Sequence, residues 1–199
     1  MKSNICTIKK GGLGLESILA EVEKVANYNE LPQKETLRLR LLAEELTGML
    51  PELVENFDGY FWLENNENKY ELHTEFSVDS LSKEKKQTLI AVSASKKNAA
   101  ACGFMGKIRD IAENMLLNSE ELHTSNRYSN EYIYDYDVAD ISYSYAWTLE
   151  HYVEHQKQTS VNTKEEWDQL EKSIVAKLAD DVILGVKGRK VEIVIKKDF

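Results

Sequence analysis

The chain has 199 residues and a net charge of −9, because 34 Asp and Glu residues outnumber 25 Lys and Arg residues. Hydrophobic residues make up 42% of it and charged residues 30%, which excludes wholesale disorder and indicates a globular protein with a full core. The negative charge repels a phosphate backbone, so we expect no general nucleic-acid binding. The sequence shows no apolar run near the roughly 20 residues that cross a bilayer and no signal-peptide core, so we expect a cytoplasmic protein without a membrane partner.

Cys6 and Cys102 are the two cysteines of the chain. They lack the spacing of a metal site, and disulfides are uncommon in the cytoplasm. We therefore interpret both as small buried hydrophobic residues.

The first part of the chain predicts a strand followed by two helices. The strand is expected from Ile5 to Lys9 and, after a glycine-rich turn, the first helix over residues 15–28. This helix carries a stripe at helical spacing: Leu15, Ile18, Leu19, Val22 and Val25. A second helix begins near Gln33, and Pro51 should bend it because a proline inside a helix removes a hydrogen bond. The buried stripe expected on this helix consists of Leu42, Leu46, Met49, Leu50, Leu53 and Phe57.

A hairpin is predicted after Gly59, where the hydrophobic period changes to two, with its turn over Asn65 to Asn68. One face of the returning strand is largely apolar and carries Tyr70, Leu72, Thr74 and Phe76. The other face carries Glu71, His73 and Glu75. We therefore expect a sheet with one buried and one wet side.

The second part of the chain predicts further helices and a closing hairpin. The helices are expected over residues 82–93, after Gly103 and from Trp167 to Leu178, and the strands over residues 182–186 and 191–195. The helix after Gly103 is expected to bury Phe104, Ile108, Ile111, Met115 and Leu116.

Residues 119–163 differ in composition, with six tyrosines and few aliphatic residues. Tyr132, Tyr134 and Tyr136 alternate with other residues in a strand-like pattern, whose aromatic face could contact a protein partner. The alternative is an irregular flap that covers its own core. We interpret the stretch as an insertion into a single domain, residues 1–199, whose scaffold comprises residues 1–118 and 164–199.

The order of the elements predicts an α+β protein: a two-layer α/β sandwich with helices on one face of a mostly antiparallel mixed sheet. This layout resembles the Bergerat ATP-binding fold of the GHKL superfamily, which includes the ATPase domains of histidine kinases and gyrase and the serine kinases that act as anti-sigma factors. The last group is the one that the chain resembles most. The resemblance implies ATP with Mg²⁺ as cofactor.

In that superfamily the second helix carries an acidic residue and, four residues on, an asparagine that holds magnesium. Here LLAEELTGML supplies Glu44 and Glu45, but Gly48 and Met49 stand where the asparagine is expected. The adenine-binding Asp-x-Gly-x-Gly box is represented by Asp79 alone. The resemblance therefore implies a degenerate nucleotide site whose ATP binding is weak or lost.

The segment ASKKNAAAC, with Asn98, takes the place of the family's lid, and GFMGKIRDI takes that of its glycine-rich segment. The residues alone also suggest an anion site here, because Gly103 and Gly106 let backbone approach a phosphate at a helix N-terminus, beside Lys107. A plain helix start with small residues for packing is the alternative. The lysines around this turn fit one small anionic ligand or a solvated helix face: Lys83, Lys85, Lys86, Lys96, Lys97 and Lys107.

Glu45 is the candidate general base of such a site, with Lys107 facing phosphate oxygens. At roughly 100° per residue, Glu45 lies about 90° from the centre of the predicted stripe, in a row with Gly48 that borders the core. A glycine there costs about 1 kcal/mol relative to alanine, so we expect a ligand or a neighbouring helix to approach the backbone at Gly48.

The sequence HYVEH at residues 151–155 fits H-x-x-E-H, the inverted zinc-protease signature. His151 and His155 would share a helical face, as two zinc ligands require, and Glu154 could act as base. No third ligand is evident, and two exposed histidines on a polar helix are the alternative.

Three functions are therefore open. We favour a regulatory or protein-binding module that keeps the scaffold, with another protein as partner through residues 119–163. The alternatives are an ATP-binding regulator or serine kinase of the anti-sigma type, and a metal-dependent hydrolase that uses His151 and His155. A homodimer is also open, and the sequence does not decide whether the protein is an enzyme.

Overall fold

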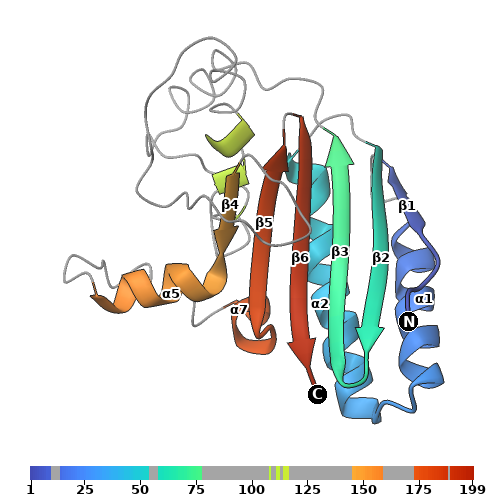
Figure 1. Ribbon diagram of the computed structural model, residues 1–199. Helices are drawn as coiled ribbons and strands as arrows, with labels where there is room; N and C mark the ends of the chain where they lie inside the picture. The colour runs from blue at the N-terminus through green and yellow to red at the C-terminus, as the bar shows by residue number, and fades with distance from the viewer. Residues whose placement is uncertain are drawn as a thin grey trace.

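Six strands form one antiparallel sheet in the order β1-β2-β3-β6-β5-β4 (Figure 1). The strands are β1 (Cys6–Lys9), β2 (Asp58–Asn66), β3 (Lys69–Ser77), β4 (Tyr145–Thr148), β5 (Asp181–Lys187) and β6 (Lys190–Asp198). The computed structural model describes residues 1–9, 14–53, 58–77, 108, 111–112, 114–116, 145–158, 173–187 and 189–199. The last strand in the chain, β6, therefore lies between β3 and β5 in the middle of the sheet.

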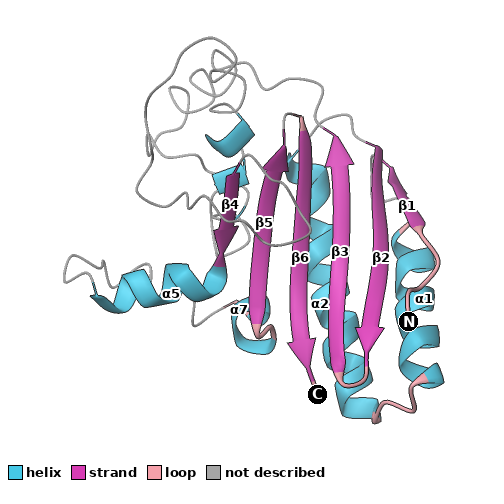
Figure 2. Cartoon of the chain, in the orientation of Figure 1, coloured by secondary structure: helices cyan, strands magenta, loops and turns pink. Residues whose placement is uncertain are grey.

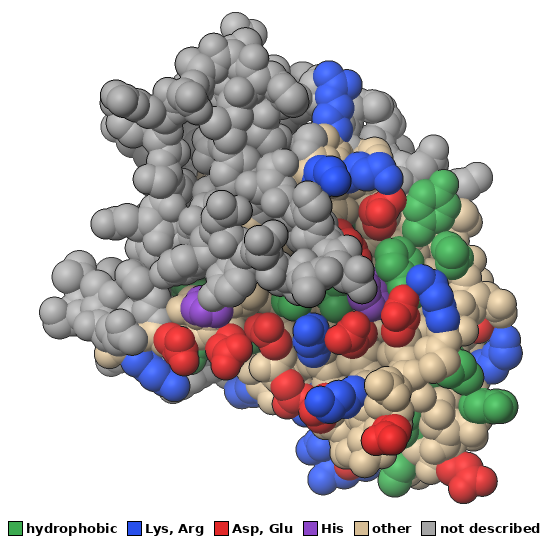
Figure 3. All heavy atoms as spheres, in the orientation of Figure 1, with side chains coloured by type: hydrophobic (Ala, Val, Ile, Leu, Met, Phe, Trp, Pro, Cys, Tyr) green, Lys and Arg blue, Asp and Glu red, His purple; other side chains and the backbone are tan. Residues whose placement is uncertain are grey.

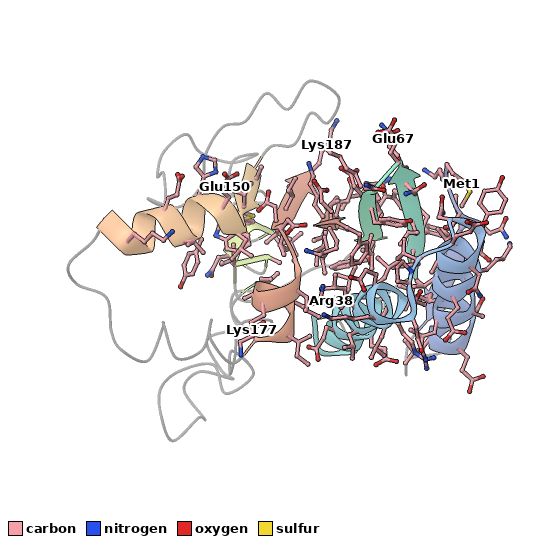
Figure 4. All side chains as sticks on the ribbon, turned by 90° about the horizontal axis from the view of Figure 1, so that it is seen from below. Met1, Arg38, Glu67, Glu150, Lys177 and Lys187 are labelled. Atoms are coloured by element: carbon pink, nitrogen blue, oxygen red, sulfur yellow. The ribbon has the colours of Figure 1, made fainter. Side chains whose placement is uncertain are left out.

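Two long helices, α1 (Leu15–Tyr28) and α2 (Gln33–Leu53), lie across one face of the sheet (Figures 1 and 2). The short helix α7 (Ile174–Leu178) contacts α2, and α5 (Leu149–Gln158) follows directly on β4. Figure 4 looks along the strands: Arg38 of α2 and Lys177 of α7 lie on the helix side, whereas Glu67 in the β2–β3 turn lies toward the other side. None of the described helices is long and apolar enough to cross a membrane.

The core lies between the sheet and these helices. In β3, the side chains of Tyr70, Leu72, Thr74 and Phe76 are at most 2% exposed. The strand registers place Leu63 of β2 and Ile195 of β6 on either side of Leu72. From the helix side the core receives Ile18, Val22, Val25 and Ala26 of α1 and Leu39, Leu42, Ala43 and Leu46 of α2. The predicted buried face of the returning strand is confirmed, as is the burial of Ile18, Val22 and Val25 in the first helix. On the face predicted to be wet, His73 is only 8% exposed.

Gly14 joins the sheet to the first helix at a point of very close backbone contact. It is the N-cap of α1, has φ 112°, and its carbonyl oxygen accepts a hydrogen bond from the Ile18 N–H at 3.0 Å. A Cβ atom at Gly14 would lie 2.3 Å from the carbonyl oxygen of Thr7 in β1. Only glycine fits both the left-handed backbone and this approach.

The predicted α+β fold class is confirmed, with α1 and α2 on one face of the sheet. The expectation of a mixed sheet is wrong for the described strands, because all five of their pairings are antiparallel. The second helix continues through Pro51 as one element. The described residues between 108 and 116 are helical and bury Ile108, Met115 and Leu116 as predicted. The predicted helix over 82–93 lies outside the described residues.

Residues 145–158, predicted to belong to an insertion, form the edge strand β4 and the helix α5. β4 pairs with β5 at the sheet edge, where Trp147 lies opposite Leu184. The Trp147 side chain is 4% exposed, and its ring centroid lies 5.7 Å from that of Tyr152. The stretch predicted as an insertion therefore contains an edge strand of the sheet and the helix that follows it.

The first turn of α5 is held by two oxygen atoms that accept its backbone N–H groups. The His151 N–H donates to Oγ1 of Thr148 at 3.3 Å, and the Glu150 N–H donates to Oδ1 of Asp181 at 3.2 Å. Thr148 is thus the N-cap residue, and Asp181 ties the helix start to the beginning of β5.

Candidate functional site

The sheet face opposite α1 and α2 carries rows of aromatic, apolar and charged side chains that run across the strands. The registers place side by side, from β2 to β5, Trp62, His73, Val194 and Ile183 in one row and Glu64, Glu71, Lys196 and Asp181 in the next. Figure 3 shows acidic and basic side chains gathered across this face. An antiparallel sheet with helices on one side offers the other side to solvent or to a partner.

Trp62 is the centre of a stacked group on this face. The imidazole of His73 stacks on its ring, with 4.9 Å between the centroids and 7° between the planes. The ammonium nitrogen of Lys2 lies 4.5 Å from the Trp62 ring centroid, within cation–π range. Oε1 of Glu64 accepts hydrogen bonds from Lys2 Nζ at 3.0 Å and from Trp62 Nε1 at 2.8 Å. These contacts fix the orientation of the indole ring.

His73 is only 8% exposed and lies between two carboxylates. Its Nδ1 is hydrogen-bonded to Oε1 of Glu192 at 3.2 Å. Its Nε2 lies 3.3 Å from Oε2 of Glu71 but without the geometry of a hydrogen bond. Glu71 in turn lies 3.6 Å from Lys196 Nζ. The imidazole therefore connects β2, β3 and β6 on the outer face of the sheet.

Residues 1–5 continue β1 along the edge of β2 through a bulge. In β1, Cys6 lies opposite Phe61, whereas Lys2 is bridged to Glu64. Three residues of the N-terminal segment therefore lie opposite two residues of β2, which defines a β-bulge with one extra residue.

The bulge is held by side chains where a regular ladder would use backbone. The Ser3 N–H donates to the Leu63 carbonyl oxygen at 2.8 Å, but the Leu63 N–H donates to Oγ of Ser3 at 2.9 Å. The Asn4 N–H turns away from β2 and donates to Oε1 of Glu21 in α1 at 3.0 Å. The segment is thus attached to both layers of the protein.

The two carboxylates that hold this segment have lowered pKa values. For Glu64, the hydrogen bond from Lys2 is the main reason that its pKa lies below 4.5, and the Trp62 N–H adds to it. For Glu21, burial alone would raise the pKa, but hydrogen bonds from the Asn4 amide and from Lys24 outweigh it and the pKa is lowered. Both groups therefore favour the charged form in the folded protein.

Glu44, one of the predicted nucleotide-site residues, belongs to an ion-pair group on the helix side. Arg40 Nε lies 3.1 Å from Oε1 of Glu44, and the same guanidinium group bonds Glu23 of α1. Arg40 therefore joins α2 to α1, and Glu44 pairs with this guanidinium group from within α2.

Glu45 and Gly48 lie farther from the core than the sequence predicts. The buried stripe of α2 includes Leu39 and Ala43, which shifts its centre. At roughly 100° per residue, Glu45 lies about 110° and Gly48 about 170° from that centre. Gly48 is exposed, and no described atom lies within 4 Å of where its Cβ would stand. The expected close approach at Gly48 is therefore not found in the described part of the chain.

The other predicted nucleotide-site residues lie outside the described residues: Asp79, Asn98, Gly103, Gly106 and Lys107. The structure consequently does not bring them together with Glu44 or Glu45. The lysines predicted to cluster near the glycine turn lie outside the described residues as well.

His151, predicted as a zinc ligand, takes part in the cap of α5. Its Nδ1 lies 2.7 Å from Oγ1 of Thr148, the same oxygen atom that accepts the His151 backbone N–H. The side chain of His155 lies outside the described residues. Among the side chains that are described, no group of three or more His, Cys, Asp or Glu is placed to hold a metal ion.

No family model, curated protein or solved structure matches this chain. The likeness to the GHKL superfamily therefore stays a prediction.

Sequence reasoning did not identify the group around Trp62. The alternation in β2 separates Trp62 from Phe61, and that in β3 places His73 on the wet face, but neither pattern gives the register between the strands. No local sequence pattern predicts the position of Lys2, because its partner Glu64 lies far along the chain, after both α1 and α2.

Proposed function

We propose that the chain is a regulatory or protein-binding module on a scaffold that resembles the GHKL ATPase domains, and that it acts without depending on nucleotide. The observation that carries the proposal is the outer sheet face at β1 and β2. There Tyr60 is 45% exposed and Ile5 is 60% exposed, next to the stacked ring of Trp62.

Aromatic side chains with a fixed orientation suit protein contacts. Tyr and Trp contribute large contact areas and lose little conformational entropy on binding. Here Trp62 is already held by His73, Lys2 and Glu64. A partner would therefore meet a preorganised surface with charged groups around it, which lowers the entropy cost of association.

The helix side supports weak or absent nucleotide binding. Glu44 is paired with Arg40, Glu45 points away from the centre of the buried stripe, and Gly48 stands where the family carries asparagine. Hydrolysis at a metal ion has no observation in its favour among the described side chains, where no group of three or more possible ligands is found. A cytoplasmic location and a contact through residues 119–163 are further parts of the proposal and rest on the sequence.

The test compares two exposed tyrosines on opposite layers. Tyr60→Ser changes the outer sheet face, and Tyr28→Ser changes α1, where Tyr28 is 76% exposed. Partners retained by the immobilised full chain from its native cell extract are identified by mass spectrometry. We expect a specific partner to be lost with Tyr60→Ser and kept with Tyr28→Ser. Equal capture by both variants would contradict the proposed surface.

A second measurement separates this function from the nucleotide alternative. Thermal unfolding is followed with millimolar ATP and Mg²⁺, because a ligand of the folded state raises the melting temperature by mass action. We expect no shift. A magnesium-dependent rise would favour the ATP-binding regulator instead.

A further inference from the structure

We propose that the outer edge of β2 at Leu63–Asn65 is a strand-addition site, whose bound occupant is an extended segment of a protein partner with a Lys or Arg opposite Glu64. This inference rests on the proposed protein-binding function and names the chemistry of the segment that would be recognised. Residues 1–5 occupy the site in the unbound protein and would be displaced.

The resident segment fits the edge of β2 imperfectly. Its bulge places the hydroxyl of Ser3 where a regular strand would present a backbone carbonyl to the Leu63 N–H. A strand without the bulge would give Leu63 a carbonyl acceptor and continue the ladder, so an incoming segment can make hydrogen bonds that residues 1–5 do not.

The resident segment also buries little apolar surface. Lys2, Asn4 and Ile5 are exposed, whereas Cys6 and Ile8 in β1 proper are 8% and 2% exposed. Segments with few buried apolar contacts and edge hydrogen bonds open locally at low free-energy cost. Opening of residues 1–5 therefore leaves β1 and the core in place.

Lys2 shows which side chain the site selects. Its ammonium group bonds Glu64 at 3.0 Å and lies over the ring of Trp62. When residues 1–5 leave, both Glu64 and Trp62 lose their cation. An incoming Lys or Arg restores both contacts, whereas an acidic residue would face the Glu64 carboxylate. Backbone pairing then supplies affinity and the cation supplies selectivity, as in other strand-addition sites.

Residues 1–5 compete well with a free peptide because they are covalently attached to β1, which gives them an effective concentration at the site on the order of millimolar. A short peptide should therefore bind weakly to the unmodified chain. It should bind more strongly when the resident segment is loosened by Lys2→Glu, which places a carboxylate against Glu64. Lys196→Glu is the matched control, because it makes the same charge change on the same face but in β6.

The probe is the capped peptide Thr-Val-Lys-Val-Thr, with Thr-Val-Glu-Val-Thr as its counterpart. Amide chemical shifts of the full-length chain are followed by NMR up to several millimolar peptide. We expect the Lys peptide to shift the Leu63 and Asn65 amides, with at least tenfold tighter binding to Lys2→Glu than to the original chain or to Lys196→Glu. Glu64→Lys should reverse the preference between the peptides. Equal binding of both peptides, or no shift at these amides in Lys2→Glu, would overturn the proposal.

Hydrogen exchange gives a test that needs no variant. The amides of Leu63 and Asn65 bond residues 1–5 and should exchange at least 100-fold faster than the Leu72 amide in the central strand β3. If all three amides exchanged only through global unfolding, residues 1–5 would not open separately and the displacement model would be excluded. If neither peptide binds as expected while Tyr60→Ser still abolishes partner capture, strand addition is wrong and the proposed function stands. If the peptide titration and the capture experiment both give the contrary result, strand addition and the proposed function are both wrong.

Discussion

Gly14 and Gly48 have opposite surroundings, so the same substitution should change stability in opposite directions. Gly14 has φ 112°, and an added Cβ would lie 2.3 Å from the Thr7 carbonyl oxygen. Gly14→Ala should therefore lower the free energy of unfolding by about 1–3 kcal/mol or more. Gly48→Ala, at an exposed helical position with no described atom near it, should raise it by about 0.5–1 kcal/mol. Urea denaturation measures both changes, and equal signs would contradict this difference.

Thr74 and Thr47 form a second pair at the residue scale. Thr74 is fully buried and its hydroxyl has no hydrogen-bond partner in the part of the chain that the structure describes, whereas the Thr47 hydroxyl donates to the Ala43 carbonyl oxygen at 2.7 Å. Because a buried unpaired hydroxyl costs about 1–3 kcal/mol, Thr74→Val should stabilise the protein by about 1 kcal/mol. Thr47→Val removes an existing bond and should be neutral or destabilising. The thermal midpoints of the two variants decide the prediction, and a loss of stability in Thr74→Val would show that its hydroxyl has a partner.

At the scale of elements, Thr148 is one of the two side chains that hold the first turn of α5. Thr148 accepts the His151 N–H and contacts the His151 ring. Thr148→Ala should lower the free energy of unfolding by about 1 kcal/mol, whereas Thr148→Ser keeps the oxygen and should lose much less. Differential scanning calorimetry of the three proteins gives the comparison. If the alanine and serine variants were equally stable, the cap would not hold the helix.

The attachment of residues 1–5 should depend on pH. The Glu64 pKa is lowered in the folded protein, so its stabilising contribution is present above the ordinary value of 4.5 and is lost as the pH falls through the lowered pKa. Glu64→Gln should therefore be less stable than the original chain at pH 7, by at most about 1 kcal/mol for an exposed ion pair, and this difference should shrink as the pH falls below 4.5. Glu67→Gln, in the exposed β2–β3 turn, serves as control. Thermal midpoints across this range test the prediction, and a pH-independent difference would contradict it.

The fold of the whole molecule depends on β6. It pairs with both β3 and β5 and buries Val191, Ile193 and Ile195 completely. A chain that ends after Lys187 would leave β3 and β5 each without a neighbour on one side and remove the centre of the core, so we expect no cooperative unfolding transition. A chain that ends after Asp198 keeps β6 and should fold. Circular dichroism against temperature distinguishes the two, and cooperative melting of the shorter chain would show that β6 is dispensable.

Local sequence patterns predicted those elements whose hydrophobic period is long and regular. The alternation of β3 and the spacing of Ile18, Val22 and Val25 in α1 gave the correct faces. The stripe of α2 was predicted off-centre because it omitted Leu39 and Ala43. The four-residue strand β4 is too short to show alternation. The bulge after Lys2 depends on a register that only tertiary pairing determines, so the group around Trp62 could not be found from the sequence.

The lengths of the strands have a consequence for solubility. The two outer strands of the described sheet, β1 and β4, have four residues each, whereas the inner strands have seven to nine. Short outer strands expose few unpaired backbone groups to other molecules. A substitution that detaches β4, such as Trp147→Asp, would uncover the apolar strand β5. Its first effect should therefore be fibrillar self-association at high protein concentration, detected by thioflavin fluorescence before the helices melt.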